Sequence, residues 1–221
     1  MKAAVSWSGG KDSCAAYYQA TTQGIEISHL LHFINGPARS HMSQGIDPRA
    51  IALQAEAMGL PIVQKTVQWE TYEAGFRDVV GQLKLTGVDC VIFGDIEEDR
   101  SSWSRKLCDQ AGVEPILPLF EREAEQIMKD FIDSGFEAIV SGVKGNLISK
   151  QWLGHRLDEE FIRRLRQLGN VNLCGANGEY HTFVIDGPTF KKRIQIPDRA
   201  SHYRDDCLWF LDISEYDLAA K

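Results

Sequence analysis

The chain has 221 residues, of which 43% are hydrophobic, and its 24 basic and 31 acidic side chains give a net charge of −7. A chain of this length and composition can bury a sizeable core, which excludes a disordered tail and a mini-protein. The acidic balance excludes the broad basic surface that binding to a nucleic-acid backbone usually requires. Because the N-terminus turns polar too early for a signal peptide and no apolar run is long enough to cross a membrane, we expect a soluble, cytoplasmic protein.

Up to about residue 145, short apolar runs rich in β-branched residues alternate with longer amphipathic stretches. This is the pattern of βαβ units that build a parallel sheet. The expected strands are residues 3–7, 25–34, 61–67, 88–93, 116–119 and 138–143. The expected helices are residues 12–22, 48–58, 71–85, 101–110 and 122–134. The pattern therefore predicts a doubly wound α/β domain over residues 1–145.

After residue 145 the pattern changes. A charged helix is expected over residues 158–168, followed by the glycine-rich turn CGANGEY and the strand-like runs HTFVIDG, KKRIQI and CLWFLDI. We interpret residues 146–221 as a smaller C-terminal α+β lobe. Since no repeat or low-complexity linker separates the two parts, we expect the lobe to pack against the sheet, with the functional site in a cleft between them.

The cysteines are widely spaced, without a C-x-x-C pair, and no histidine cluster has zinc-finger spacing. We therefore expect neither disulfides nor structural zinc. Each cysteine is interpreted as a small buried hydrophobe in a reducing compartment. The five positions are Cys14, Cys90, Cys108, Cys174 and Cys207.

The strongest motif lies directly after the first expected strand and before the first expected helix. It is the loop Ser8-Gly9-Gly10-Lys11-Asp12-Ser13. At this position of an α/β sheet, a helix N-terminus presents unpaired N–H groups to an anionic ligand. The glycines permit close backbone approach, the serines offer hydroxyl groups, and Lys11 supplies a positive charge. Asp12 could cap the helix or help to hold Mg²⁺, and the alternative interpretation is a plain glycine turn before a capped helix.

The loop fits neither the Walker pattern nor the G-x-G-x-x-G fingerprint of dinucleotide sites. It resembles the PP-loop of the ATP pyrophosphatases. This resemblance implies a Rossmann-like fold of the adenine nucleotide alpha hydrolase type, and cleavage of ATP between its α- and β-phosphates while the loop holds the departing pyrophosphate. Related PP-loop enzymes thiolate tRNA, make NAD or join ammonia to carboxylates, so the loop alone does not identify the substrate.

A second segment, FGDI, places Gly94 and Asp95 at the carboxyl end of a central strand, where they could line the nucleotide pocket. The alternative for Asp95 is an ordinary loop carboxylate. The PP-loop resemblance alone implies that adenine lies against backbone groups near residues 30–33, which include Leu31 and His32.

A third segment is richer in polar groups than a plain hairpin needs. Glu179 and His181 alternate along an extended run and should share a face, where a carboxylate and an imidazole could bind or deprotonate an amine. The alternative is a structural hairpin with a surface Glu and His. The candidate acceptor-binding residues are Cys174, Gly175, Asn177, Gly178, Glu179, Tyr180, His181 and Thr182.

Taken together, SGGKDS, QAEAMGLPIV, FGDI, the QWLG and LDEEF segments and GEYHTFVIDGPTFK resemble the diphthine–ammonia ligase family from end to end. The resemblance implies a reaction in which ATP, Mg²⁺ and ammonia convert the carboxylate of diphthine, a modified histidine on elongation factor 2, into an amide. AMP and pyrophosphate are the other products. By this resemblance Lys11, Asp12, Glu179 and His181 are the catalytic candidates. The chain has Ala176 where the family usually has a second acidic residue.

Other functions stay open at this point. The acceptor could be protein-borne diphthine or a small metabolite, and ammonia could come from solution or from a partner. An ATP sensor without turnover is the main alternative, followed by a PP-loop enzyme acting on a small metabolite or on tRNA. Although Cys108 or Cys174 alone could carry a persulfide, the missing C-x-x-C pair disfavours thiolation, and we expect no nucleic-acid partner. A homodimer is compatible with the sequence.

Overall fold

The computed structural model describes residues 1–35, 45–196, 202–205, 207–213 and 215–221. The chain forms two compact units, and each consists of several separate stretches of sequence. Unit 1 comprises the described parts of residues 1–8, 12–36 and 60–122. Unit 2 comprises the described parts of residues 9–11, 37–59 and 123–221.

The centre of unit 1 is a five-stranded sheet in the order β3-β2-β1-β4-β5, in which every neighbouring pair is parallel. This order is that of a Rossmann-like doubly wound sheet, so the predicted fold class is confirmed. The strands are β1 (Lys2–Ser6), β2 (Glu26–Asn35), β3 (Ile62–Val67), β4 (Cys90–Ile92) and β5 (Glu114–Ile116). The helices that connect them within unit 1 are α1 (Lys11–Thr22), the short η2 (Trp69–Thr71), α3 (Tyr72–Lys84) and α4 (Glu98–Ala111).

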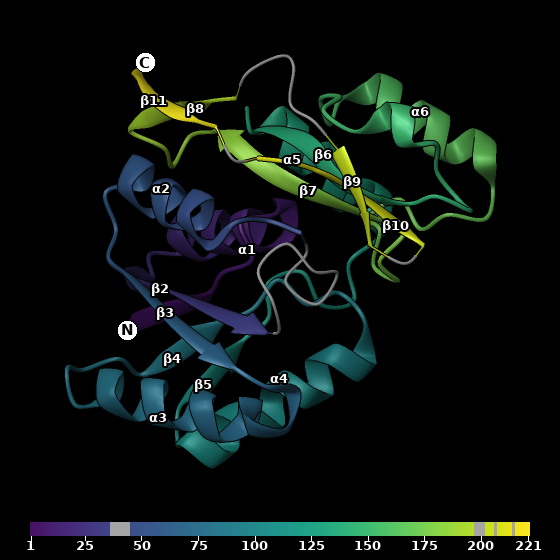
Figure 1. Cartoon of the computed structure of the whole chain (residues 1–221). Coiled ribbons are helices and arrows are strands. Elements are labelled where there is room, and N and C mark those ends of the chain that lie inside the picture. Colours follow the sequence, from purple (N-terminus) through teal and green to yellow (C-terminus); the bar gives the residue numbers. More distant parts are fainter. Residues whose placement is uncertain (36–44, 197–201, 206, 214) are drawn as a thin grey trace. The chain divides into compact units, whose positions relative to one another are not determined.

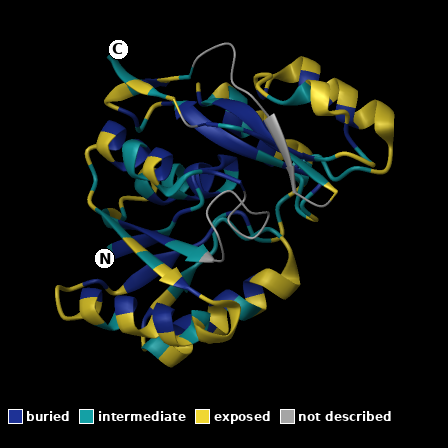
Figure 2. Ribbon diagram, in the orientation of Figure 1, coloured by how far each residue is buried: buried dark blue, intermediate teal, exposed yellow. Residues whose placement is uncertain are grey.

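Helices cover both faces of this sheet, with α3 and α4 along one face and α1 on the other (Figure 1). The central strands are therefore rich in buried apolar residues, as in β1, where Ala3, Ala4 and Val5 are buried, and in β4, where all three residues are buried. Phe76 and Leu83 of α3 and Leu107 of α4 pack in one cluster with Leu31 and Val91 of the sheet. Figure 2 shows this buried interior beneath the exposed outer faces of the two helices.

Unit 2 contains a four-stranded antiparallel sheet in the order β7-β6-β10-β9 and a two-stranded β11-β8 pair. The strands are β6 (Glu137–Lys144), β7 (Tyr180–Asp186), β8 (Lys192–Gln195), β9 (His202–Asp205), β10 (Leu208–Leu211) and β11 (Asp217–Ala220). The helices are α2 (Pro48–Met58), α5 (Ala124–Asp133), the short η3 (Lys150–Trp152) and α6 (Glu159–Leu168). The C-terminal part thus contains a smaller antiparallel sheet with helices, as the sequence predicts, although unit 2 as a whole also takes in residues that precede 146.

One expected strand has different partners from those predicted. Residues 138–143 were expected in the parallel sheet, but β6 pairs antiparallel with β7 and β10 in unit 2. The run is buried on both faces, and such a run has the same sequence pattern in a parallel sheet as in an antiparallel one. The predicted division at residue 145, with ATP binding before it and acceptor binding after it, concerns function and stays a prediction.

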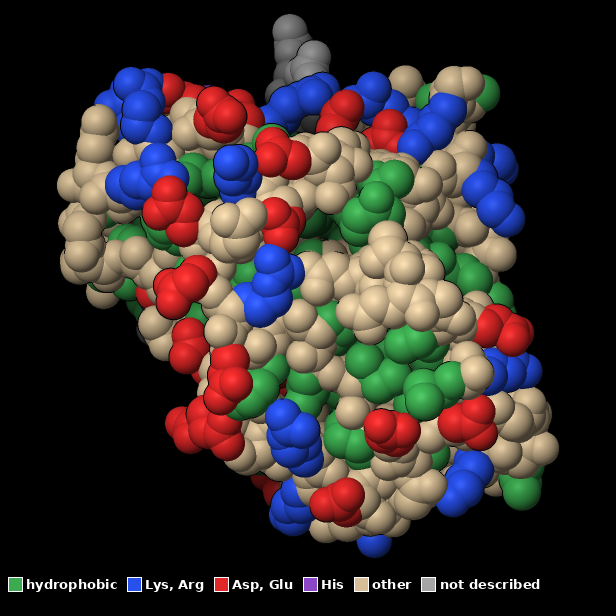
Figure 3. Space-filling view, turned by 180° about the vertical axis from the view of Figure 1, so that it is seen from behind, with side chains coloured by type: hydrophobic (Ala, Val, Ile, Leu, Met, Phe, Trp, Pro, Cys, Tyr) green, Lys and Arg blue, Asp and Glu red, His purple; other side chains and the backbone are tan. Residues whose placement is uncertain are grey.

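Two further observations concern the surface. Among the described residues, no helix combines the length and the apolar character that a membrane span needs. On the face shown in Figure 3, acidic and basic side chains are interspersed rather than gathered by sign.

Candidate active site

Residues 8–10 of the SGGKDS loop lie between β1 and α1, as the sequence predicts, and Lys11, Asp12 and Ser13 form the first turn of α1. Gly9 has a φ of 79°, in the left-handed region. A Cβ atom there would lie 2.4 Å from Cδ1 of Ile51 and 2.5 Å from Oε1 of Gln54, so a larger residue does not fit. The hydroxyl oxygens of Ser8 and Ser13, both in unit 1, are 3.3 Å apart. Gly9, Gly10 and Lys11 belong to unit 2, so the contacts of the loop divide between the two units.

Lys11 meets three of the predicted acceptor-binding residues. Its side chain is buried, and its ammonium group donates a hydrogen bond to the carbonyl oxygen of Cys174 and lies 5.2 Å from the centre of the Tyr180 ring. Its backbone N–H donates to the hydroxyl oxygen of Thr182 at 3.0 Å. The structure therefore brings a residue from the N-terminal loop into direct contact with the C-terminal motif, inside unit 2.

Glu179 holds the turn that precedes β7. Its carboxylate accepts hydrogen bonds from the backbone N–H groups of Asn172 and Asn177, each at 3.0 Å, and from the Asn177 amide at 3.2 Å. Burial alone would raise the pKa of the Glu179 carboxyl, but these hydrogen bonds outweigh burial and lower it. The carboxylate is therefore anionic at neutral pH and fixes the loop. In the turn, Gly175 and Gly178 both have positive φ, and the N–H of Gly178 donates to the carbonyl oxygen of Gly175 at 2.8 Å.

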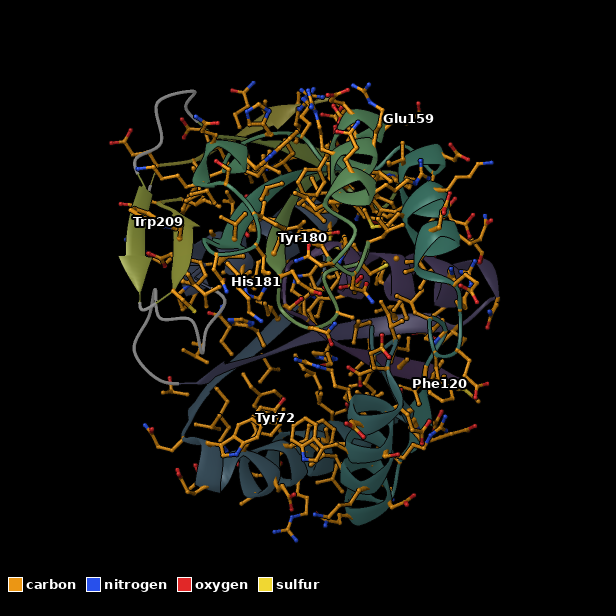
Figure 4. All side chains as sticks on the ribbon, turned by 90° about the vertical axis from the view of Figure 1, so that its right-hand side faces the viewer. Tyr72, Phe120, Glu159, Tyr180, His181 and Trp209 are labelled. Carbon is orange, nitrogen blue, oxygen red and sulfur yellow. The ribbon has the colours of Figure 1, made fainter. Side chains whose placement is uncertain are left out.

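His181 follows Tyr180 on β7 (Figure 4) and makes a different kind of contact. Its ring stacks on that of Phe210 with 6.1 Å between centroids and 10° between planes. Gly142 of β6 pairs with both residues, and the missing side chain at Gly142 lets the two rings meet across the strand. The carboxylate of Glu179 binds loop amides while this imidazole stacks, so their joint action on one amine stays a prediction.

Gly94 and Asp95 lie beside the end of the SGGKDS loop that belongs to unit 1. A Cβ atom at Gly94 would lie 2.6 Å from the carbonyl carbon of Asp12 and 2.9 Å from the backbone nitrogen of Ser13. Burial raises the pKa of the Asp95 carboxyl, which accepts a hydrogen bond from the Ser104 hydroxyl, and the negative charge of Asp12 raises it further. The charge of Asp12 thus acts on the Asp95 carboxyl, as expected for two loops that follow adjacent parallel strands.

Replacing Gly94 by alanine should disturb this packing, because the new methyl group meets backbone atoms that cannot move aside. We expect Gly94→Ala to lower the free energy of unfolding by about 1–3 kcal/mol and to weaken ATP binding. Chemical unfolding and equilibrium binding measure the two effects. The matched control is Gly81→Ala in α3, where the added Cβ contacts nothing within 4 Å and a small gain in stability is expected. Equal effects at both positions would contradict the proposed close approach.

Leu31 and His32 lie on β2, and both are buried. Leu31 belongs to the apolar core of unit 1. Burial lowers the pKa of His32, and its Nδ1 is 2.8 Å from the carbonyl oxygen of Trp7. Because a carbonyl oxygen can only accept, Nδ1 carries the proton in a neutral ring. The structure does not test their predicted position near adenine.

Four of the five cysteines are buried as predicted, and Cys207 is exposed. Burial raises the pKa of Cys90 to about 11 and that of Cys108 to about 12, so both thiols stay protonated at neutral pH. The Cys174 thiol is directed to the carbonyl oxygen of Ala124. These thiols are therefore packing groups, which leaves the Cys174 carbonyl as the part of that residue that faces Lys11.

Gln54 is a site residue that the sequence analysis missed. It is fully buried in α2, and its amide nitrogen donates to the carbonyl oxygens of Gly9 at 2.9 Å and Val184 at 2.7 Å. The sequence does contain a signal for Gln54, which is its position in the helix. Gln54 follows Ile51 by three residues and Ala50 by four, so it lies on the apolar face of α2. A polar residue on such a face needs a buried partner.

Comparison with known proteins identifies relatives over most of the chain. Residues 1–115 match the diphthamide synthase N-terminal domain, and residues 123–218 match the diphthamide synthase C-terminal domain. The diphthine–ammonia ligase of Bos taurus is 31% identical, in an alignment that covers 88% of this chain and 82% of that protein. The diphthine–ammonia ligase of Danio rerio is also 31% identical, over 86% of this chain and 84% of that protein.

One solved structure, described as a predicted subunit of tRNA methyltransferase from Methanocaldococcus jannaschii, is similar at a TM-score of 0.45 and 16% identity. The similarity covers 85% of this chain and 98% of that chain. A likeness at this level does not bear on function.

Proposed function

Because the chain belongs to the diphthamide synthase family, we propose that it adenylates the carboxylate of a diphthine-like acceptor and opens the adenylate with ammonia. As a member of this family it is an ATP-dependent enzyme of the carbon–nitrogen ligase type. The observation that carries the proposal is the contact of Lys11 with Cys174, Tyr180 and Thr182. An adenylating ligase needs a phosphate-binding lysine in direct contact with an acceptor motif. An ATP sensor does not need this arrangement.

In the proposed first step, an oxygen of the acceptor carboxylate attacks the α-phosphorus of ATP, and the bond from that phosphorus to the bridging oxygen of the β-phosphate breaks. Pyrophosphate leaves with the bonding electrons. The loop amides and the Lys11 ammonium would stabilise this developing negative charge. The Cys174 carbonyl and the Tyr180 ring orient the ammonium group without cancelling its charge, since neither carries a full negative charge.

In the proposed second step, the nitrogen of ammonia attacks the acyl carbon and AMP leaves as the amide forms. The nitrogen then loses a proton. We propose that the loop held by Glu179 binds the acceptor and that His181 orients the acceptor or the incoming ammonia. Since hydrogen bonds lower the pKa of Glu179, this carboxylate is a weak base and its contribution is to hold the loop.

Mg²⁺ is a further part of the proposal, and the residues of unit 1 fit it. Mg²⁺ takes hard oxygen ligands and is usually bound by one or two carboxylates together with substrate phosphates. Asp12 in the first turn of α1 and Asp95 after β4 provide two carboxylates, and the charge of Asp12 acts on the Asp95 carboxyl. They would hold the ion, which would supply positive charge against the ATP phosphates. Among the described residues, no group of three or more His, Cys, Asp or Glu side chains could bind a metal by itself, so this site would depend on ATP.

The experiment that tests the function is ammonia-dependent release of AMP and pyrophosphate from ATP and Mg²⁺ by the purified protein. Elongation factor 2 carrying diphthine and a panel of small carboxylates serve as acceptors. Stimulation by one acceptor would support an amide-forming ligase and identify its substrate. Saturable ATP binding without AMP formation from any acceptor would favour the sensor instead.

A further inference from the structure

We propose that Gln54 is a positioning residue that sets the affinity of the phosphate loop for the two outer phosphates of ATP. The proposal rests on the proposed function in one respect, because it takes the ligand of residues 9–11 to be the part of ATP that leaves as pyrophosphate. The evidence comes from unit 2 alone, which contains Gln54, the loop residues 9–11 and β7.

The first observation is that the loop lies along the edge strand of the antiparallel sheet. In the strand order of this sheet, β7 is an outer strand, so one row of its backbone groups needs partners from elsewhere. The N–H of Val184 donates to the carbonyl oxygen of Gly9 at 3.0 Å, and the Thr182 hydroxyl accepts from the N–H of Lys11 at 3.0 Å. The loop thus takes its conformation partly from β7.

The second observation is that Gln54 of α2 forms hydrogen bonds to both the loop and β7. A side-chain amide has two N–H hydrogens, and the carbonyl oxygens of Gly9 and Val184 accept from its nitrogen. The Gly9 carbonyl therefore accepts from both Gln54 and Val184. Because Gln54 is fully buried, no water can replace its amide if the side chain is shortened or made apolar.

These bonds fix the peptide between Gly9 and Gly10. A trans peptide is planar, so holding its carbonyl oxygen on one side also fixes the direction of its N–H on the other. Gly9 has a φ of 79°, and the peptide cannot turn without breaking the bonds from Gln54 and Val184. Gln54 thus preorganises the loop backbone, and preorganisation increases affinity because less conformational freedom is lost on binding.

The packing of α2 alone does not require a polar side chain at this position. Gln54 lies among buried residues of α2 that are apolar, namely Ala50, Ile51 and Ala55. A leucine or methionine would fill similar volume there without burying a polar group. The amide is needed because of the two carbonyl groups that it holds.

The test compares the binding of ATP, AMP and inorganic pyrophosphate to the full-length protein in the presence of Mg²⁺, without acceptor or ammonia. We expect Gln54→Leu to weaken ATP and pyrophosphate binding about tenfold, which corresponds to about 1.4 kcal/mol. AMP lacks the two outer phosphates, and we expect its affinity to change by less than about twofold, given that the loop contacts act on those phosphates. Unchanged ATP affinity would overturn the proposal, and so would a parallel loss for ATP and AMP.

Two further variants make the result specific. Gln54→Met keeps the length and flexibility of the side chain, so it tests the same amide if the leucine variant does not fold. Leu165→Ala removes buried apolar volume from α6 in the same unit and should lower thermal stability without changing the ratio of AMP to ATP affinity. If the wild-type protein binds ATP but never forms AMP, the ligase function is refuted. The ratio of AMP to ATP affinity would still test the positioning role of Gln54.

Discussion

The Lys11→Met variant is expected to release pyrophosphate at least about a hundredfold more slowly than the wild type, because one preorganised charge on the leaving group is lost. Methionine keeps an unbranched stem beside the Tyr180 ring while removing the ammonium that the Cys174 carbonyl holds. Lys11→Ala should abolish the release. The measurement is the initial rate of pyrophosphate formation with ATP, Mg²⁺, ammonia and acceptor.

The control for this variant is Lys129→Met, which removes an exposed lysine from α5 in the same unit. Its rate should equal that of the wild type. Turnover by Lys11→Met at the wild-type rate would show that the loop does not stabilise the leaving group, and the assignment of residues 8–13 to pyrophosphate would fall.

The Glu179→Ala variant should lose both stability and activity. Removing the carboxylate leaves the N–H groups of Asn172 and Asn177 without their acceptor, and we expect the free energy of unfolding to fall by about 1–3 kcal/mol. The freed turn no longer fixes the Cys174 carbonyl, so Lys11 loses its orientation. We expect turnover to fall about tenfold or more, because a misplaced Lys11 ammonium stabilises the leaving group less well. Chemical unfolding and the pyrophosphate assay measure the two effects.

The stability difference should also depend on pH. Because the folded pKa of Glu179 lies below its unfolded value of about 4.3, the carboxylate contributes its full stability above that value and loses it as pH falls through the folded pKa. Wild type and variant should therefore converge only in acid, below about pH 4. Glu26→Ala, which removes an exposed carboxylate from β2, is the control. If Glu179→Ala keeps full activity and saturable ATP binding, the predicted acceptor-binding segment has only a structural role.

The parts of the fold that could be predicted from the sequence are those with local signals. Short buried strands alternating with amphipathic helices indicated the parallel sheet of unit 1. The position of SGGKDS after the first strand and at the start of the first helix was also predicted, while the anion site expected there stays a prediction. Gly94 could be placed beside that loop because the carboxyl ends of neighbouring parallel strands meet at one edge. In each case the pattern extends over a few residues and has one usual structural meaning.

The parts that could not be predicted depend on contacts between distant residues. The run that forms β6 is buried on both faces, and periodicity does not say which strands it joins. The partners of Glu179 are largely backbone amides, which leave no mark in the sequence. The stacking of His181 on Phe210 requires Gly142 between them. No local sequence pattern indicates that β7, β6 and β10 are neighbours.

The contact between Lys11 and Thr182 has a consequence for protein synthesis, because 171 positions separate the two residues along the chain. At about 5–20 residues per second, roughly 10 to 30 s pass between the translation of the loop and that of its partner strand. During this interval the ribosome-bound chain has the SGGKDS sequence but not the strand that shapes it. A nascent or truncated chain ending before β7 should therefore not consume ATP, so this activity is available only after β7 itself has been made.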